Sequence, residues 1–238
     1  MNKIPKIIHQ IWSDVNQPLP SFFKSLSETW KEQYPDWDYI FWDDDKMNRF
    51  VQDFYPSCWD IYSRFPYDMQ RWDAIRYLIL DKMGGMYVDF DYESLLPLHP
   101  LIGDKVCCFG LEPASHAAKK EWEVTIGTAL IVSTPGHPFI KKVMQSVFVE
   151  DNLHPGDQSK TDFVLSSTGP WNLTGVYNGL SEDEKKAICL IPAKYVFPFD
   201  FHQAKRLMSG EVNEKLENCL NEAYAIHYFS GEWLKTNT

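Results

Sequence analysis

Cysteine is scarce in this 238-residue chain: there are five, and none stands in a CxxC pair. An odd, scattered set of this kind predicts neither a disulfide framework nor a zinc site and favours a reduced, cytosolic setting. No segment approaches the roughly 18 uninterrupted apolar residues of a spanning helix, and the first residues lack an apolar run of signal-peptide length. We expect a cytoplasmic protein that at most contacts the cytoplasmic face of a membrane.

Positive charge is also in short supply. The chain has 23 lysines and arginines against 33 aspartates and glutamates, for a net charge of -10 at pH 7. This balance argues against nonspecific attraction to nucleic acid or to an anionic membrane as the main role. If the ligand is itself anionic, a cation has to lie between the ligand and the protein.

Apolar runs alternate with amphipathic segments along the chain, which predicts an α/β layer fold. With 44% hydrophobic residues and no visible linker, the length suits one domain over residues 1–238. Strands are expected at Lys6–Trp12, Asp38–Trp42, Met86–Asp89, Lys105–Gly110, Ile126–Ser133, Ala187–Ile191 and Tyr224–Phe229.

Helical spacing of apolar residues predicts three helices. The first starts at Pro20, and the third covers His137–Phe148. The second covers Tyr67–Met83 and stops at two glycines. In the first helix, one apolar face is expected to hold Phe22, Phe23, Leu26 and Trp30. Three segments are expected to be polar surface, namely a helix cap at Asp43–Asp45 and loops at Glu112–Glu123 and Glu150–Ser167.

The most informative segment is a strand that ends in Asp89-Phe90-Asp91. Because side chains alternate along a strand, Tyr87, Asp89 and Asp91 are expected on one side of it. Two carboxylates about 6.6 Å apart repel each other unless a cation is near, and their oxygens suit Mg²⁺ or Mn²⁺. An aspartate pair in a solvated turn is the simpler alternative, but the position at a strand exit favours a metal site.

Asp73 and Arg76 stand one helical turn apart in the helix that precedes this strand. They lie on the same face, so they either form a simple surface ion pair or together grip a polyhydroxylated ligand. Their place directly before the strand with two aspartates favours the second interpretation.

Together these motifs resemble the DXD-containing sugar-binding glycosyltransferases of family 32, which include the fungal initiating mannosyltransferase and bacterial capsular polysaccharide enzymes. The residues that carry the resemblance are Ile4–Trp12, Tyr34–Trp37, Trp42–Asp44, Asp73–Tyr77, Gly84–Asp91, Pro135–Phe139, Thr168–Pro170 and His227–Trp233.

The resemblance implies a GT-A type nucleotide-sugar-binding fold with a mixed central sheet flanked by helices. It also implies a metal-dependent retaining transferase that moves a hexose from a UDP- or GDP-sugar to an oligosaccharide or lipid-linked saccharide, in polysaccharide or glycan biosynthesis. The cofactor would be Mn²⁺ or Mg²⁺. A departing nucleoside diphosphate gathers negative charge, and a divalent cation lowers that barrier.

The resemblance also implies roles for single residues. Asp91 would bind the metal directly, Asp89 would meet the ribose or sugar, and His227 would complete the metal site. Tyr87 would lie near the nucleotide and Trp12 against its base, while Asp73 and Arg76 would hold donor hydroxyls and, with Asp89 and Asp91, form the catalytic set. His9 and Trp233 would also contact the donor. In this sequence Glu232 replaces the serine that commonly precedes the final tryptophan, and it is either a further ligand or solvated.

Some alternatives stay open at this level. His9 and Trp12 could be core residues, and Trp171 could pack under a loop or form a platform for an acceptor sugar. We favour front-face attack with the departing phosphate taking the acceptor proton, and no nucleophile can be named. A phosphohydrolase with Asp89 as nucleophile is a second hypothesis, although Glu93 replaces its expected threonine. A noncatalytic carbohydrate-binding domain is the third.

Overall fold

A mixed six-stranded sheet forms the centre of the molecule. The computed structural model describes residues 3–15, 17–211 and 213–231. The strand order is β2-β1-β3-β6-β5-β7, in which β6 runs antiparallel to β3 and β5 while the remaining neighbours are parallel. The strands are β1 Ile7–Ile11, β2 Asp38–Trp42, β3 Gly85–Val88, β5 Cys107–Leu111, β6 Ile126–Ser133 and β7 Cys189–Ile191. A separate two-stranded sheet pairs β4 Tyr92–Ser94 with β8 Ala225–His227.

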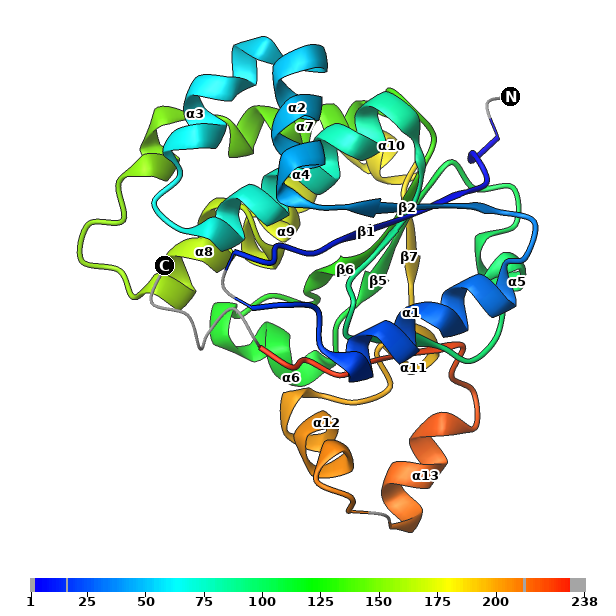
Figure 1. Cartoon of the computed structure of the whole chain (residues 1–238). Helices are drawn as coiled ribbons and strands as arrows, with labels where there is room; N and C mark the ends of the chain where they lie inside the picture. The colour runs from blue at the N-terminus through cyan, green and yellow to red at the C-terminus, as the bar shows by residue number, and fades with distance from the viewer. Residues whose placement is uncertain (1–2, 16, 212, 232–238) are drawn as a thin grey trace.

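Helices cover both faces of the six-stranded sheet (Figure 1). One core holds Tyr87, Phe109 and Ile131 with the buried sides of α4 and α7, and the other holds Met86 and Val88 with α1. The helices are α1 Ser21–Gln33, α2 Asp44–Phe54, α3 Trp59–Arg64, α4 Asp68–Met83, α5 His99–Ile102, α6 Ala114–Ala117, α7 Pro138–Val147, α8 Lys160–Ser167, α9 Pro170–Asn178, α10 Glu182–Lys185, α11 Ala193–Val196, α12 Phe201–Met208 and α13 Glu214–Leu220. Short 3₁₀ turns lie at Pro56–Cys58, Ala118–Lys120 and Glu150–Leu153.

All seven predicted strands are present, and the bounds of β2 and β6 agree with the prediction. The prediction for β3 was wrong at its end. This strand stops at Val88, because the chain turns at Phe90 and Asp91 before β4 begins. The two aspartates are therefore brought to one side by a turn rather than by strand alternation.

The buried helix α4 places its residues against β3 and β6. Every residue from Asp73 to Leu80 is buried, because the helix lies between the sheet and the other helices on that face. The predicted stop at two glycines is confirmed. Gly84 and Gly85 have φ of +65° and +101°, and a Cβ on Gly85 would lie 2.6 Å from the Ile7 carbonyl oxygen. Only glycine fits this tight connection into β3.

Two local expectations were wrong. Residues Lys160–Ser167 form α8 instead of a loop, with Ser159 as its N-cap and Phe163 and Val164 buried. The helix has few apolar residues and lies within a polar stretch, so the helical periodicity of apolar residues is weak there. In α1, Phe22 was expected on the buried apolar face but is 43% exposed. It lies at the edge of that face, where its ring contacts the ring of Tyr228.

Helices α12 and α13 project away from the sheet at the bottom of Figure 1. They enclose a small core of their own around Phe199, Ala204, Leu216 and Ile226. Within the described ranges no helix is both long and apolar enough to cross a bilayer. The assignment of residues 1–238 to one domain stays a prediction.

Candidate active site

A cleft of about 520 Å³ lies beyond the carboxyl ends of β1, β3 and β5. In open α/β sheets this edge is where ligands bind. Each of the three strands delivers a polar or aromatic residue to the cleft directly after it ends, namely Trp12, Asp89 and Glu112. Helix α4 contributes Asp73 and Arg76, and β8 contributes His227.

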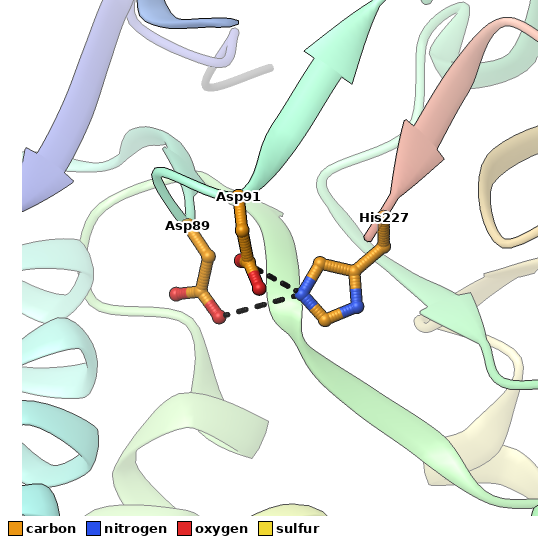
Figure 2. Close-up of side chains that lie close together, drawn as sticks. All are labelled: Asp89, Asp91 and His227. Atoms are coloured by element: carbon orange, nitrogen blue, oxygen red, sulfur yellow. Dashed lines mark hydrogen bonds and ion pairs between the residues drawn. The ribbon is translucent and has the colours of Figure 1, made fainter. Parts of the chain in front are cut away.

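Asp89, Asp91 and His227 converge at one end of the cleft (Figure 2). The Nε2 atom of His227 lies 3.0 Å from Asp91 Oδ1 and 4.0 Å from Asp89 Oδ2. One ligand atom from each residue falls within 4.8 Å of the other two. Two carboxylates and an imidazole at this spacing fit a divalent cation such as Mn²⁺ or Mg²⁺.

Backbone hydrogen bonds hold the cluster in place. The Asp89 amide donates to the Ala129 carbonyl of β6 at 2.9 Å, which fixes the turn after β3. Pairing of Tyr92 with His227 brings β8 alongside the second aspartate. The Ser230 amide donates to Asp91 Oδ2 at 2.8 Å, and the preceding Phe229 has φ of +47°. A phenylalanine rarely adopts this conformation, and strained backbone of this kind collects at functional sites.

In the cluster, Asp91 and His227 each favour the charged form of the other. Burial acts to raise the pKa of Asp91, but the charge and hydrogen bond of His227 and the Ser230 hydrogen bonds lower it to about 2. Burial acts to lower the pKa of His227, yet the neighbouring carboxylates, Asp91 foremost, raise it above its ordinary value. The carboxylate of Asp91 is therefore ionised at neutral pH, as a metal ligand must be.

Asp73 and Arg76 form the floor of the cleft, each with a side chain only 2% exposed. Arg76 Nη2 lies 2.9 Å from Asp73 Oδ1, and Arg76 Nη1 donates to the Thr128 carbonyl at 2.7 Å. Asp73 Oδ2 accepts from the Thr168 hydroxyl at 3.0 Å. Its Oδ1 is buried, and although it lies beside the Arg76 guanidinium it makes no well-directed hydrogen bond.

Burial and neighbouring charges have opposite effects on the pKa values of Asp73 and Arg76. Burial raises the pKa of Asp73 to about 6, and Arg76 and Thr168 counteract only part of that effect. Burial acts to lower the pKa of Arg76, but Tyr87 and Asp89 outweigh it and raise the pKa above its ordinary value. The guanidinium carbon lies 4.6 Å from the centre of the Tyr87 ring.

Trp12 and Tyr87 are the aromatic residues predicted near the nucleotide. Trp12 follows β1, donates its indole N–H to the Gln17 carbonyl at 3.1 Å, and meets Phe23 and Phe90 edge-on. Tyr87 is buried and donates its hydroxyl to Asp89, with burial as the main reason that its pKa is raised well above the ordinary value. Both residues line the cleft.

The structure brings seven of the predicted site residues to the same cleft: Trp12, Asp73, Arg76, Tyr87, Asp89, Asp91 and His227. His9 is not among the residues that line it. Its Nδ1 accepts from the Trp42 indole at 3.2 Å and its Nε2 donates to the Gly84 carbonyl at 2.9 Å, so it is a fully satisfied core histidine. Glu232 and Trp233 lie outside the described residues.

Several residues that line the cleft were not among the predicted site residues, including Trp72, Glu112, Asp200 and Phe201, and the stretch Glu112–Glu123 was expected to be a polar surface loop. Glu112 had a usable signal, since it directly follows a buried strand in the same way as Asp89. Asp200 also had a local signal, because it forms a capping box with Gln203 at the start of the amphipathic helix α12, but that signal does not show that the helix lies at the cleft. Trp171 lines the cleft and lies under the ammonium group of Lys120, 4.1 Å from the ring centre.

Comparison with known proteins agrees with this geometry. Residues 20–107 match the family described as glycosyltransferase sugar-binding region containing DXD motif. The chain is 30% identical over 174 residues to inositol phosphoceramide mannosyltransferase 1 of Schizosaccharomyces pombe, covering 71% of this chain and 50% of that protein. It is 32% identical over 174 residues to mannosyl phosphorylinositol ceramide synthase SUR1 of Saccharomyces cerevisiae, covering 73% and 42%.

The chain thus spans about half the length of the curated relatives that it matches. Among solved structures, PaToxG glycosyltransferase superposes with a TM-score of 0.57 at 19% identity, over 94% of this chain and 90% of that one. This likeness shows the fold, which is the GT-A glycosyltransferase fold with a mixed sheet flanked by helices. The chain thus has the GT-A fold, and its residues 20–107, which include Asp89 and Asp91, match the glycosyltransferase sugar-binding region that contains the DXD motif.

Proposed function

We propose that this protein is a metal-dependent retaining glycosyltransferase that moves a hexose from a nucleoside diphosphate donor to a hydroxyl of a saccharide or of a lipid-linked polyol. The names of the relatives, which specify mannosyl transfer and inositol phosphoceramide, favour mannose as the sugar and an inositol-bearing lipid among the acceptors. A role in glycan biosynthesis, a cytoplasmic location and contact with a membrane face belong to the same proposal.

The observation that carries the proposal is the charge of the cleft. Among the described residues that line it, Arg76 is the only lysine or arginine, and Asp73 and Thr128 already hold that guanidinium. A diphosphate would therefore meet mostly carboxylates. The three-residue cluster at Asp89, Asp91 and His227 supplies the ligands for a divalent cation, which when bound offsets the charge of the diphosphate as its bond to the sugar breaks.

The chain's own residues would bind and orient the donor. Trp12 offers an aromatic face for the base, and the charged pair Asp73 and Arg76, which lines the cleft, suits the hydroxyls of the sugar. In the retaining reaction that we favour, the acceptor oxygen attacks from the face that the diphosphate leaves, and the acceptor proton passes to that diphosphate. This route requires no carboxylate nucleophile on the protein.

A screen of nucleotide sugars by thermal shift, with and without Mn²⁺, tests the proposal. GDP-mannose, UDP-glucose, UDP-galactose and UDP-N-acetylglucosamine should be compared, since a ligand at 100 times its Kd stabilises the native state by about 2.7 kcal/mol. We expect at least one donor to raise the melting temperature only with Mn²⁺, and to be hydrolysed or transferred. Absence of any shift, with or without the metal, would contradict the proposal.

Two further measurements would favour the alternatives. Nucleotide-independent binding of free sugars would indicate the noncatalytic carbohydrate-binding domain. Trapping of fluoroberyllate on Asp89 would indicate the phosphohydrolase.

A further inference from the structure

A second carboxylate site lines the cleft beyond the metal cluster. Glu112 directly follows β5, and His116 lies one helical turn later in α6. Both residues line the cleft, with side chains 13% and 21% exposed. Gly127 in β6 leaves room for Glu112, because a Cβ on that glycine would lie 3.3 Å from Glu112 Cγ and 2.7 Å from the ring of Phe197.

Glu112 therefore lies on the face of β6 that Phe197 covers, whereas Arg76 reaches the cleft from α4 on the opposite face. The irregular register between β5 and β6 helps to aim it, since the pairing shifts between Phe109 and Leu111. Such irregularities often redirect a side chain next to an active site.

The hydrogen bonds of His116 fix its own tautomer and the orientation of Glu112. Its Nε2 accepts from the Phe201 amide at 3.3 Å, so this nitrogen carries no proton. The ring proton must then be on Nδ1, which donates to Glu112 Oε2 at 2.9 Å. A neutral imidazole leaves the negative charge of the carboxylate in place.

The other oxygen, Oε1, has no hydrogen bond to any residue in the described ranges, and it belongs to a side chain that lines the cleft. Glu112 is also close enough to His227 to contribute to the raised pKa of that imidazole. A bare carboxylate beside the metal cluster repels a phosphate, but it readily accepts a hydrogen bond from a neutral hydroxyl.

We infer that Glu112 is a positioning residue for the acceptor: its Oε1 accepts a hydrogen bond from a hydroxyl of the acceptor's polyhydroxylated ring, while His116 holds the carboxylate in orientation. The inference rests on the proposed function. The residues that we propose for the donor hydroxyls, Asp73 and Arg76, lie on the other side of β6, so the ring beside Glu112 would be that of the acceptor. Glu112 takes no proton; the acceptor oxygen bonds to the sugar carbon and its proton leaves with the diphosphate.

The test compares Glu112→Gln with the wild type. In this variant the amide oxygen can still accept from His116, which turns the amide NH₂ toward the cleft and replaces the acceptor atom with a donor. Methyl α-D-mannopyranoside and myo-inositol serve as acceptor probes. We expect the acceptor kcat/KM to fall by roughly 10- to 100-fold, mainly through KM, as is typical for a lost hydrogen bond to a charged group. The affinity for GDP or UDP with Mn²⁺, measured by calorimetry, should stay at the wild-type value.

Glu123→Gln is the matched control, because it makes the same chemical change at an exposed residue of the same segment that does not line the cleft. It should leave acceptor KM unchanged. His116→Gln should lower acceptor kcat/KM in the same direction as Glu112→Gln.

Two results would overturn the inference about Glu112: an unchanged acceptor KM, or a parallel loss of nucleotide affinity, which would place this residue at the donor. A third result would overturn it and leave the proposed function standing. In that case the wild type binds nucleotide and Mn²⁺ but transfers sugar to neither acceptor probe, and neither probe gives a saturation-transfer NMR signal when GDP and Mg²⁺ are bound. Failure of the wild type to bind any nucleotide would instead remove the proposed function on which the inference rests.

Discussion

His9 and Asp73 are both buried polar side chains, but only His9 has a hydrogen-bond partner for each of its polar atoms. His9 has a protein partner at each ring nitrogen, and burial lowers its pKa to about 4, so it is neutral near pH 7. Asp73 has a buried oxygen without a well-directed hydrogen bond and a raised pKa. A satisfied group stabilises the fold, whereas a group that is left partly unsatisfied marks a place where a ligand can bind.

Replacement of His9 tests this distinction. His9→Leu leaves the Trp42 indole N–H and the Gly84 carbonyl without their partner, and each such orphan costs roughly 1–3 kcal/mol. Urea unfolding should show this destabilisation, while the affinity for nucleotide and Mn²⁺ stays unchanged at temperatures where the variant is folded. If the variant has wild-type stability but has lost its affinity for nucleotide, His9 would instead be a donor-binding residue, as the sequence predicted.

The raised pKa of Asp73 predicts a pH-dependent stability. Because the folded-state pKa of about 6 lies above the ordinary value of 3.8, the native state binds this proton more tightly than the unfolded chain does. The resulting stabilisation is complete below about pH 4 and is lost as the pH rises through 6. Asp73→Asn removes the effect. The free energy of unfolding of the variant minus that of the wild type should therefore rise by up to about 3 kcal/mol from pH 4 to pH 7.5.

Chemical denaturation of both proteins across that pH range measures the difference. Asp53→Asn, at an exposed position of α2, is the control and should show a nearly flat difference. A difference for Asp73→Asn that is flat, or that falls as the pH rises, would contradict the buried, partly compensated carboxylate.

At the scale of elements, the metal cluster depends on the fit between β5 and α11. Gly110 in β5 lies against Phe197, and a Cβ there would come within 2.5 Å of the Phe197 ring. That ring is buried, and its centre is 5.3 Å from the centre of the His227 ring. The position of a side chain in the candidate metal site is thus set partly by a glycine on a different sheet.

Gly110→Ala should therefore lower both the stability and the metal affinity. Overpacking of a buried site typically costs about 1–3 kcal/mol, and the displaced Phe197 should weaken Mn²⁺ binding by moving His227. Gly175→Ala in α9 is the matched control, because no atom lies within 4 Å of its added Cβ; it should stabilise the protein by up to about 1 kcal/mol. Unchanged Mn²⁺ affinity in a clearly destabilised Gly110→Ala would show that Phe197 does not position His227.

The sequence predicted the elements whose signal is local. The apolar run of β6 and the double glycine after α4 each specify their structure without distant contacts. The turn at Phe90 and Asp91 was read as the end of a strand, because local pattern cannot show where β8 pairs with β4. For the same reason the role of Glu112 was missed: its meaning depends on Gly127 and His116, which meet it only in the folded chain.

The whole molecule combines a net charge of -10 with a cleft whose described lining holds a single arginine. Long-range repulsion and local carboxylates both oppose a nucleoside diphosphate. We therefore propose that binding of such a ligand is coupled to a divalent cation at Asp89, Asp91 and His227. On this proposal the cation and the nucleotide bind together, and neither is held well without the other.

Calorimetric titration of GDP and UDP into the wild type and into Asp91→Asn, with Mn²⁺ and then with a chelator, tests this claim most directly. We expect nucleotide to bind to the wild type only with Mn²⁺, and to bind at least about tenfold more weakly to Asp91→Asn. Circular dichroism verifies that the variant is folded, and Asp45→Asn at an exposed residue should behave as wild type. Equal affinity in the chelator, or in folded Asp91→Asn, would contradict the account.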